Sequence, residues 1–379
     1  MSVVVEGECA SEFIAVRRAF ERNFAEHGEL GAAVSVYHEG RLVVDLWGGL
    51  RDRESGRRWQ ADTICTMMSV AKGICALSIA MLANRGLLTL DDPVAKHWPE
   101  FAAEGKGEVT IRQALGHLAC IPVTDAAGEG DYYDYAKMVG AIAAQRPLWP
   151  IATQQVYHSA TLGFMAAEIL RRVTGLTIGQ FIRRNLQQPL GADYFIGLTT
   201  AEQSRCATMV RSAGNSINAA KSADPQSIEA RMWRPLPGNE SYNSPQWRSA
   251  EMPSVNGHGT ARGVARIYGA LANGGSIDGV NVIDLNALAP FLEEQLPTPL
   301  PPVPQRLRMA VGFMLNSPPH RATGPNLQTF GHSGAGGSQA FCDPVAKIGF
   351  CYTTNLMQDG TETGIRAESL VASAFARGR

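Results

Sequence analysis

The sequence of 379 residues has no marked excess of either charge and no long uninterrupted apolar run. Because the formal net charge is −1 and lysine and arginine do not cluster, the chain is not expected to bind nucleic-acid phosphates. No apolar stretch reaches the roughly 20 residues that a membrane-spanning helix needs, so no membrane partner is expected either. At 45% hydrophobic residues, the chain can nevertheless bury a large core.

The sequence also lacks the marks of an exported or metal-dependent protein. Residues 1–8 contain neither the basic start nor the long apolar core of a signal peptide. The seven cysteines form no CxxC pair, and the eight histidines show no metal-ligand spacing such as HExxH. We therefore expect a cytoplasmic protein with reduced thiols and without a metal or cofactor. A disulfide between Cys342 and Cys351, which flank a predicted hairpin, is the less favoured alternative.

Strand patterns gather at the two ends of the chain, and helical patterns fill the middle. The predicted strands are residues 32–38, 42–47, 338–342 and 347–354. Helices are expected over 11–25 before them and near 365–376 after them, and Thr110, Thr177 and Thr260 are predicted helix N-caps. The pattern predicts an α+β fold in which N- and C-terminal strands form one antiparallel sheet flanked by helices.

This pattern divides a single unit into three parts. An α/β subdomain is expected from about 1–85 and 255–379, and a mostly helical region is inserted at about 86–204. Residues 205–255 are rich in Ser, Asn and Pro and show little periodicity. An irregular stretch of that length is typically a functional lid or specificity loop, or else disordered. The proline-rich residues 296–304 are interpreted as a spacer.

The stretch Ser69-Val70-Ala71-Lys72 opens a long apolar helical pattern and carries the strongest chemical signal. Residues three apart share a helix face, so the hydroxyl and the amine are expected to be neighbours. The serine would sit at the helix N-terminus, where unpaired N–H groups favour negative charge. A nucleophile, a base and an anion site are what acyl transfer requires. In the alternative, Ser69 is only an N-cap and Lys72 a solvated lysine, although a buried helix argues against that.

Two further segments are candidates for the same site. Tyr157-His158-Ser159 precedes an apolar helix, where a tyrosine can also be simple packing. The run from Phe330 to Ser338 holds several glycines, which allow close approach of a ligand to the backbone but also occur in ordinary turns.

Ser333 in this run nearly matches the nucleophile-elbow pattern. That elbow needs a strand, a turn and a helix, and it has glycine where this chain has Ala335. A strand is expected to follow instead, so Ser333 is the less favoured nucleophile.

In order and spacing, the three segments resemble the serine β-lactamase and penicillin-binding protein superfamily, with its S-x-x-K, Y-x-N or S-x-N, and K-T-G motifs. The match is most similar to family VIII carboxylesterases, which resemble class C β-lactamases, and it covers nearly the whole chain. Further matching segments are residues 45–49, 85–94, 157–163, 256–262 and 331–337. Ser159 stands where β-lactamases carry an asparagine that holds the substrate amide. His332 replaces the lysine of K-T-G that meets a carboxylate of the antibiotic, and Cys120 stands where glycine is expected.

The resemblance implies a β-lactamase-like fold and a role for each matching residue. Ser69 would be the nucleophile, and Lys72 and Tyr157 would share the role of general base. The backbone N–H groups of Ser69 and Ala335 would form the oxyanion hole. Ser159, His332 and Gly334 would complete the substrate site. Either the pKa of Lys72 lies well below the usual lysine value of ~10.4, so that its amine is neutral, or Lys72 stays charged and keeps Tyr157 as a phenolate.

These observations predict a serine hydrolase that cleaves carboxylic esters with short or medium acyl chains through an acyl-enzyme on Ser69. The alternatives are an amide or peptide hydrolase, a weak β-lactamase or an acyltransferase with the same site, and a non-catalytic binding relative. The expected partner is a small-molecule ester or amide, and the oligomeric state is not predicted. His258, between two glycines, either lines the site or is a loop histidine that the backbone satisfies, which is the favoured reading.

Overall fold

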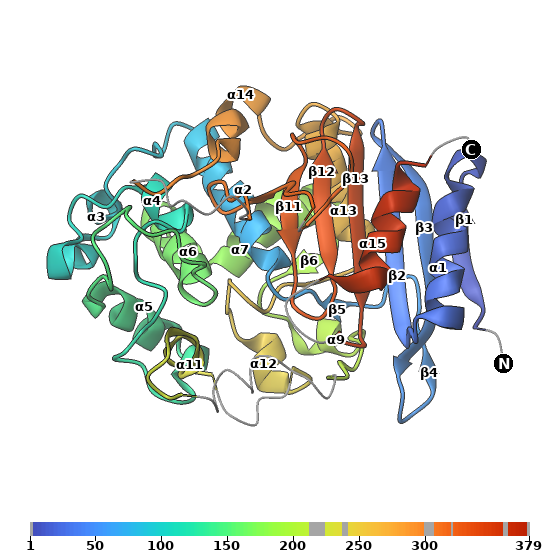
Figure 1. Cartoon of the computed structure of the whole chain (residues 1–379), viewed down its shortest axis with the longest axis horizontal. Coiled ribbons are helices and arrows are strands. Elements are labelled where there is room, and N and C mark those ends of the chain that lie inside the picture. Colours follow the sequence, from blue (N-terminus) through green and yellow to red (C-terminus); the bar gives the residue numbers. More distant parts are fainter. Residues whose placement is uncertain are drawn as a thin grey trace.

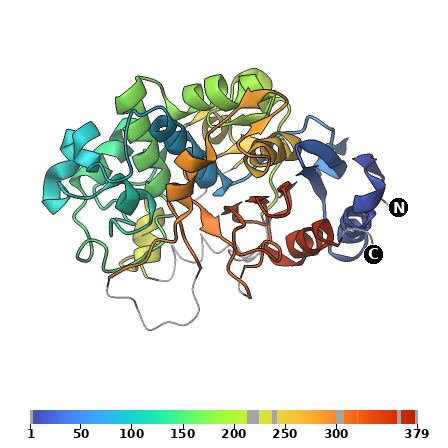
Figure 2. The same ribbon diagram turned by 90° about the horizontal axis from the view of Figure 1, so that it is seen from above.

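The computed structural model describes residues 3–211, 224–236, 242–298, 307–319, 321–358 and 363–376. A large sheet occupies one side of the molecule and a cluster of helices the other, and both views show this division (Figures 1 and 2). Most of the predicted proline-rich spacer and parts of the predicted lid-like segment lie outside the described residues.

The main sheet is antiparallel throughout and follows the order β1-β3-β2-β13-β12-β11-β10, with β4 paired to β3. Its strands are β1 (Val5–Cys9), β2 (Gly31–His38), β3 (Arg41–Asp52), β4 (Arg57–Arg58), β10 (Met314–Leu315), β11 (Phe330–Ser333), β12 (Gln339–Asp343) and β13 (Ile348–Thr354). The two ends of the chain meet at its centre, where β13 pairs with β2 from Ile348 opposite His38 to Thr354 opposite Ala32. The predicted α+β architecture is thus confirmed.

Local sequence explains how the chain turns within this sheet. Glu39 and Gly40 join β2 to β3 and both have positive φ, as the tightest hairpins require. Strand β1 was not predicted. It has only five residues, and glutamate at every second position leaves little hydrophobic signal. The register sets Cys342 opposite Gly349 and Cys351 opposite Ala340, and all seven cysteines are free thiols. The alternative disulfide is therefore wrong.

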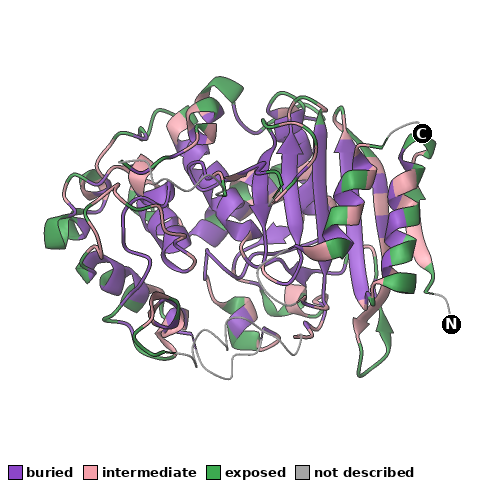
Figure 3. Cartoon of the chain, in the orientation of Figure 1, coloured by how far each residue is buried: buried purple, intermediate pink, exposed green. Residues whose placement is uncertain are grey.

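Helices cover both faces of the sheet. On one face, α1 (Ile14–Glu26) and α15 (Gly364–Ala374) lie side by side over a core that includes Phe20, Phe350 and Leu370 (Figure 1). On the other face, α13 (Ala261–Ala272) packs against β2, β12 and β13, and α2 (Val70–Asn84) against β11. Every α2 residue from 70 to 82 is buried, as Figure 3 shows, so the helix expected behind Ser69 is a core helix.

The remaining elements form the helical side and small sheets. The helices are α3 (Val94–His97), α4 (Ile111–Leu115), α5 (Tyr135–Ala144), α6 (Thr161–Thr174), α7 (Ile178–Ile182), α8 (Gln188–Leu190), α9 (Thr200–Gln203), α11 (Ile228–Trp233), α12 (Pro245–Ser249) and α14 (Leu285–Leu288). The short strands are β5 (Cys65–Thr66), β6 (Tyr194–Phe195), β7 (His258–Gly259), β8 (Ser276–Ile277) and β9 (Val280–Asn281). The predicted N-caps Thr110, Thr177 and Thr260 each accept a backbone hydrogen bond from the third residue of their helix.

The described part of residues 205–255 is less irregular than expected. It contains α11 and α12, whose N-caps Ser227 and Ser244 each accept a backbone N–H. Helices of five or six residues are too short to show a helical period in sequence, which explains the difference. The predicted role of this segment as a lid stays a prediction. Within the described ranges, no helix combines the length and the apolar character that crossing a bilayer requires.

Candidate active site

Ser69 stands at the N-terminus of α2, where a buried helix meets the solvent. It is the N-cap residue and is partly exposed, while Val70 and the residues after it are buried. The residue before it, Met68, has a φ of 48°, a left-handed conformation that is costly for a side chain of this size. The serine hydroxyl therefore lies on a constrained turn at the accessible end of a rigid core helix.

Lys72 lies one helical turn further on, and its side chain is wholly buried. Its Nζ is 3.0 Å from Ser69 Oγ and donates to the carbonyl oxygen of Ser254 at 2.9 Å. Among the described residues no carboxylate pairs with it. Burial without a counter-charge lowers the pKa of Lys72 to about 7. The expected serine–lysine contact is thus present, and the amine is able to lose its proton near neutral pH.

Ser254, which the sequence did not single out, is placed by a close helix contact. Its Oγ donates to the Ala160 carbonyl and accepts from the Gly163 N–H, both at 2.7 Å. A Cβ on Gly163 would lie 2.4 Å from the backbone of Pro253 and Ser254. Only glycine at this point of α6 allows the 253–254 backbone to approach, and this approach presents the Ser254 carbonyl to Lys72.

Tyr157 completes a group of three around the serine. Its ring centroid is 5.1 Å from Lys72 Nζ, and its hydroxyl is 3.4 Å from Nε2 of His332. Burial raises the pKa of Tyr157 to about 12, although a hydrogen bond with Ser69 acts in the opposite direction. The two pKa values favour a neutral Lys72 beside a protonated Tyr157 over a charged lysine beside a phenolate.

Two buried histidines, which sequence reasoning missed as a pair, hold the Tyr157 segment. His117 Nδ1 accepts the backbone N–H of His158 at 2.9 Å, and its ring centroid is 5.0 Å from that of Tyr157. His158 Nε2 accepts the Ile121 N–H at 3.1 Å, while its Nδ1 donates to the Val156 carbonyl at 2.5 Å. Burial lowers the pKa of His158 to about 4, so its neutral ring joins the Ile121 N–H to the Val156 carbonyl.

The same loop explains Cys120, for which the sequence offered no account. Cys120 has a φ of 57°, in the left-handed region that favours glycine, so the expectation of glycine there has a conformational basis. Its Sγ lies 3.5 and 3.4 Å from the carbonyl oxygens of Leu118 and Pro150. The buried thiol is accommodated by these weak contacts, and burial raises its pKa.

The glycine-rich run lies directly beside the serine segment. A Cβ on Gly334 would lie 2.1 Å from the Met67 carbonyl oxygen, so a larger residue would push the end of β11 away from Ser69. The backbone N–H groups of Ser69 and Ala335 donate to no acceptor among the described residues. Two unused N–H groups on adjoining segments, near a serine hydroxyl, are suited to bind an oxyanion.

The other predicted substrate residues surround this point. His332 is buried, its Nδ1 donates to the Ser333 carbonyl at 2.6 Å, and burial with the nearby Lys72 holds its pKa well below the usual value. It is therefore neutral where the superfamily pattern has a lysine. Ser159 is partly exposed, and its N–H donates to the Tyr157 carbonyl.

Two further residues that the sequence singled out lie in strands: the strand expected after Ser333 is present as β12, whereas His258 departs from its expected place in a loop. Ser333 lies within β11 and accepts a hydrogen bond at 2.8 Å from Arg321, a cation that sequence reasoning missed because it stands in an unpatterned loop. His258, favoured as a loop histidine, instead lies in β7, opposite Thr66 and Phe195. Burial lowers its pKa to about 3, so it stays neutral. Within the described ranges, no group of three or more His, Cys, Asp or Glu residues is arranged to hold a metal ion.

Comparison with known proteins assigns this site to a family. The family model described as Beta-lactamase matches residues 16–374. The chain belongs to the β-lactamase family. Over 363 residues it is 31% identical to the esterase/β-lactamase LipL of Mycobacterium tuberculosis, covering 93% of this chain and 83% of that protein. The expected resemblance to the β-lactamase superfamily is confirmed.

Solved structures of β-lactamase-like proteins agree over almost the whole length. A penicillin-binding protein homolog from Caulobacter crescentus superposes with a TM-score of 0.88 and 37% sequence identity. A family VIII carboxylesterase gives the same two values. Each comparison covers 98% of this chain and 99% of the other. The predicted β-lactamase-like fold and the likeness to family VIII carboxylesterases are both confirmed.

Proposed function

We propose that this β-lactamase family member is a serine hydrolase that cleaves carboxylic esters with short or medium acyl chains. The observation that carries the proposal is the 3.0 Å contact between Ser69 Oγ and a buried Lys72 amine whose pKa is about 7. A neutral amine at that distance can accept the serine proton as the hydroxyl attacks a carbonyl. The names of the M. tuberculosis relative and of the family VIII structure support an esterase.

The proposed reaction proceeds in two halves. Ser69 Oγ attacks the ester carbonyl while Lys72 Nζ takes its proton, and the N–H groups of Ser69 and Ala335 stabilise the oxyanion. Each such donor typically contributes about 2.7–4 kcal/mol to the barrier. The alcohol then leaves, and it receives a proton from Lys72 through the Tyr157 hydroxyl. A water molecule activated by the same pair hydrolyses the acyl-enzyme and restores Ser69.

The residues around Ser69 favour an ester over a β-lactam. His332 is neutral, so it supplies no positive charge for the carboxylate of an antibiotic at the K-T-G position. Ser159 replaces the asparagine that would hold a substrate amide, and a hydroxyl offers one donor where an amide offers two. An amide substrate would therefore lose contacts that an ester does not need.

The first test compares hydrolysis of p-nitrophenyl butyrate by wild type and Ser69→Ala, with Ser333→Ala as the matched control. We expect activity to disappear in the first variant and to persist in the second, and a serine-directed phosphonate to label only proteins with Ser69. Unchanged activity in Ser69→Ala would overturn the assignment of the nucleophile. Absence of both turnover and labelling in wild type would favour a non-catalytic binding protein.

A further inference from the structure

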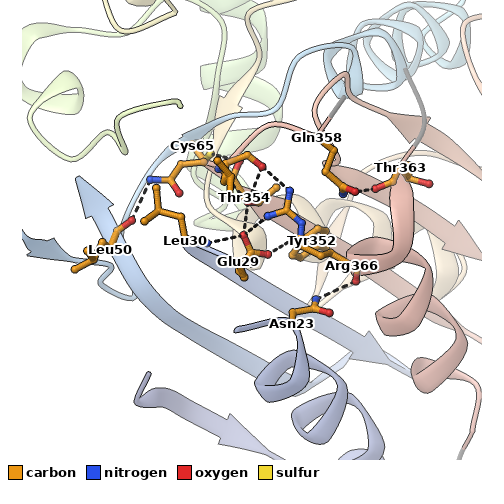
Figure 4. Close-up of polar contacts among 12 residues, drawn as sticks. Asn23, Glu29, Leu30, Leu50, Cys65, Tyr352, Thr354, Gln358, Thr363 and Arg366 are labelled. Carbon is orange, nitrogen blue, oxygen red and sulfur yellow. Dashed lines mark hydrogen bonds and ion pairs between the residues drawn. The ribbon is translucent and has the colours of Figure 1, made fainter. Parts of the chain in front are cut away.

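A buried ion pair lies on the far side of the sheet from α2 and joins the two ends of the chain. Glu29 follows α1, and its fully buried carboxylate accepts a hydrogen bond at 2.7 Å from Nη1 of Arg366, a residue of α15 (Figure 4). The same carboxylate accepts the Thr354 hydroxyl at 2.6 Å and the Tyr352 hydroxyl. Three side chains from α15 and β13 thus meet at one carboxylate in the loop after α1.

This cluster reaches beyond the ion pair to the segment that follows β13. Arg366 uses its second terminal nitrogen, Nη2, to donate to the Leu356 carbonyl at 2.6 Å. The Thr354 hydroxyl accepts the Leu356 N–H at 3.2 Å. Two atoms of Leu356 are therefore held by side chains that are themselves bound to Glu29. A guanidinium can serve both partners at once because its donors point in fixed, divergent directions.

The segment after Leu356 contacts the glycine loop of the candidate site, which comprises residues 334–337. The Gln358 N–H donates to the Gly336 carbonyl at 3.0 Å, and Gln358 Nε2 donates to the Thr363 carbonyl at 2.7 Å (Figure 4). A Cβ on Gly336 would lie 2.8 Å from the Met357 side chain. Gly336, the residue after Ala335, is therefore in direct contact with residues 357 and 358.

The cluster also touches the segment that leads to Ser69. Cys65, in β5, places its Sγ 3.4 Å from the Thr354 carbonyl oxygen. The backbone N–H groups of Ser69 and Ala335 therefore stand on two segments, each of which contacts residues 354–358.

We propose that Glu29 and Arg366 are positioning residues that fix the Ala335 N–H in the oxyanion hole through Leu356 and Gln358. The inference rests on the proposed function, since it assigns a support to that same site. A buried ion pair often adds little net stability compared with apolar residues, so its value here is geometric. If the pair loosens, the donor at Ala335 moves relative to Ser69 while the serine–lysine contact stays intact.

Arg366→Lys is the variant that separates positioning from stability. A lysine keeps a positive charge for Glu29, but a single ammonium on a different stem does not reproduce the divergent contacts to Glu29 and Leu356. Glu168→Gln is the matched control, because Glu168 is another fully buried carboxylate, paired with Arg171 and Arg172 on α6. It disrupts the ion pairs of a buried carboxylate without touching residues 354–358.

The measurement is kcat per active site, with sites counted by phosphonate labelling carried to completion, together with KM for p-nitrophenyl butyrate. We expect Arg366→Lys to lower kcat per labelled site at least tenfold and to change KM less than twofold. Glu168→Gln should lower the melting temperature and leave kcat per labelled site within twofold of wild type. A merely structural role for Arg366 would lower the number of labelled sites instead.

A second readout reports on the oxyanion hole itself. Sulfur accepts hydrogen bonds weakly, so the thionoester analogue of the substrate gains less from the N–H donors than the ester does. We expect the ester-to-thionoester ratio of kcat/KM to fall several-fold in Arg366→Lys and to stay unchanged in Glu168→Gln.

If Arg366→Lys does not fold, Thr354→Val provides the same test, because it removes the hydroxyl that joins Glu29 to the Leu356 N–H and keeps a side chain of similar volume. A ratio and a kcat per site equal to those of wild type in the folded variant would overturn the inference. Failure of wild type to be labelled at Ser69 would instead overturn the proposed function.

Discussion

Among the residues that the structure describes, two lysines are completely buried, and they differ in what surrounds them. Lys72, beside the serine, and Lys106, in the helical part, both have 0% exposed surface. Each ammonium also lies above an aromatic ring, 5.1 Å from the centroid of Tyr157 and 5.4 Å from that of Phe101. Burial lowers the pKa of both. Burial alone therefore does not distinguish a candidate base from a structural lysine.

The difference lies in the acceptors. Lys106 donates to the carbonyl oxygens of Ala103, Ala143 and Gln145 at 2.7, 2.9 and 2.7 Å, so all three of its N–H groups are used and its charge is stabilised. Lys72 contacts only one carbonyl oxygen and one hydroxyl, and this hydroxyl carries a proton that it can donate to the neutral amine. Lys72 therefore has fewer acceptors to hold a positive charge than Lys106 has, and it has a proton donor beside it, as a general base would require.

The largest effect that separates the two lysines concerns catalysis. We expect Lys72→Met to lower kcat/KM for p-nitrophenyl butyrate on the order of 10³-fold, because the serine loses its proton acceptor. Lys106→Met removes the same atoms from the helical part and should leave kcat per phosphonate-labelled site within twofold of wild type. Equal losses in both variants would show that Lys72 contributes only to packing.

The second effect is on stability. Lys106→Met is expected to lower the free energy of unfolding, and Lys72→Met is expected to raise it. Lys106→Met leaves three buried carbonyl groups without a donor and should lower the free energy of unfolding by about 2–3 kcal/mol. Burial lowers the pKa of Lys72 from 10.5 to about 7, which means that the charged form of Lys72 destabilises the folded chain by at most ~5 kcal/mol. Lys72→Met removes this cost and loses two hydrogen bonds.

Lys72→Met should therefore be more stable than wild type at pH 6, by about 1–3 kcal/mol. Urea unfolding of the two variants and wild type, followed by circular dichroism, measures both differences. A loss of stability in Lys72→Met equal to that in Lys106→Met would show that Lys72 is bound as a structural cation.

The same contrast shows how far sequence reasoning reached. Ser69 and Lys72 could be paired because helical spacing of three residues fixes a contact within one element, and the apolar residues after them predict burial. Lys106 could not be recognised as buried, since its three acceptors come from two separate segments, one of them 37 to 39 residues further along the chain. Contacts within an element are predictable from spacing, whereas contacts between elements are not.

The supports of the site show the same limit. His117 contacts the Tyr157 segment from a different loop, and Glu29 is separated from Arg366 by 337 positions. Nothing in the local pattern of either residue indicates such a partner. The antiparallel sheet built from both ends, by contrast, was predicted from where the strand patterns lie along the chain, and the family resemblance, which covers nearly the whole chain, implied the β-lactamase-like fold. The left-handed φ of Cys120 became visible only in the structure.

The smallest expected effect, and the most specific to Lys72, is the pH dependence. Only the neutral amine accepts the serine proton, so kcat/KM should rise about tenfold per pH unit below 7 and level off above it. His158 and His258, with pKa values of about 4 and about 3, are neutral throughout this range and add no inflection there.

Stability should follow the same titration with a sign that can be worked out. The pKa of Lys72 is lower in the folded chain, at about 7, than the ordinary value of 10.5, so between these values the unfolded chain binds more protons. The contribution of Lys72 to stability therefore rises with pH from about 7 to 10.5 and is constant below 7. Unfolding free energies from pH 6 to 9 should rise more steeply in wild type than in Lys72→Met. Equal slopes, together with a rate profile that is flat through pH 7, would mean that Lys72 is charged and that Tyr157 acts as the base.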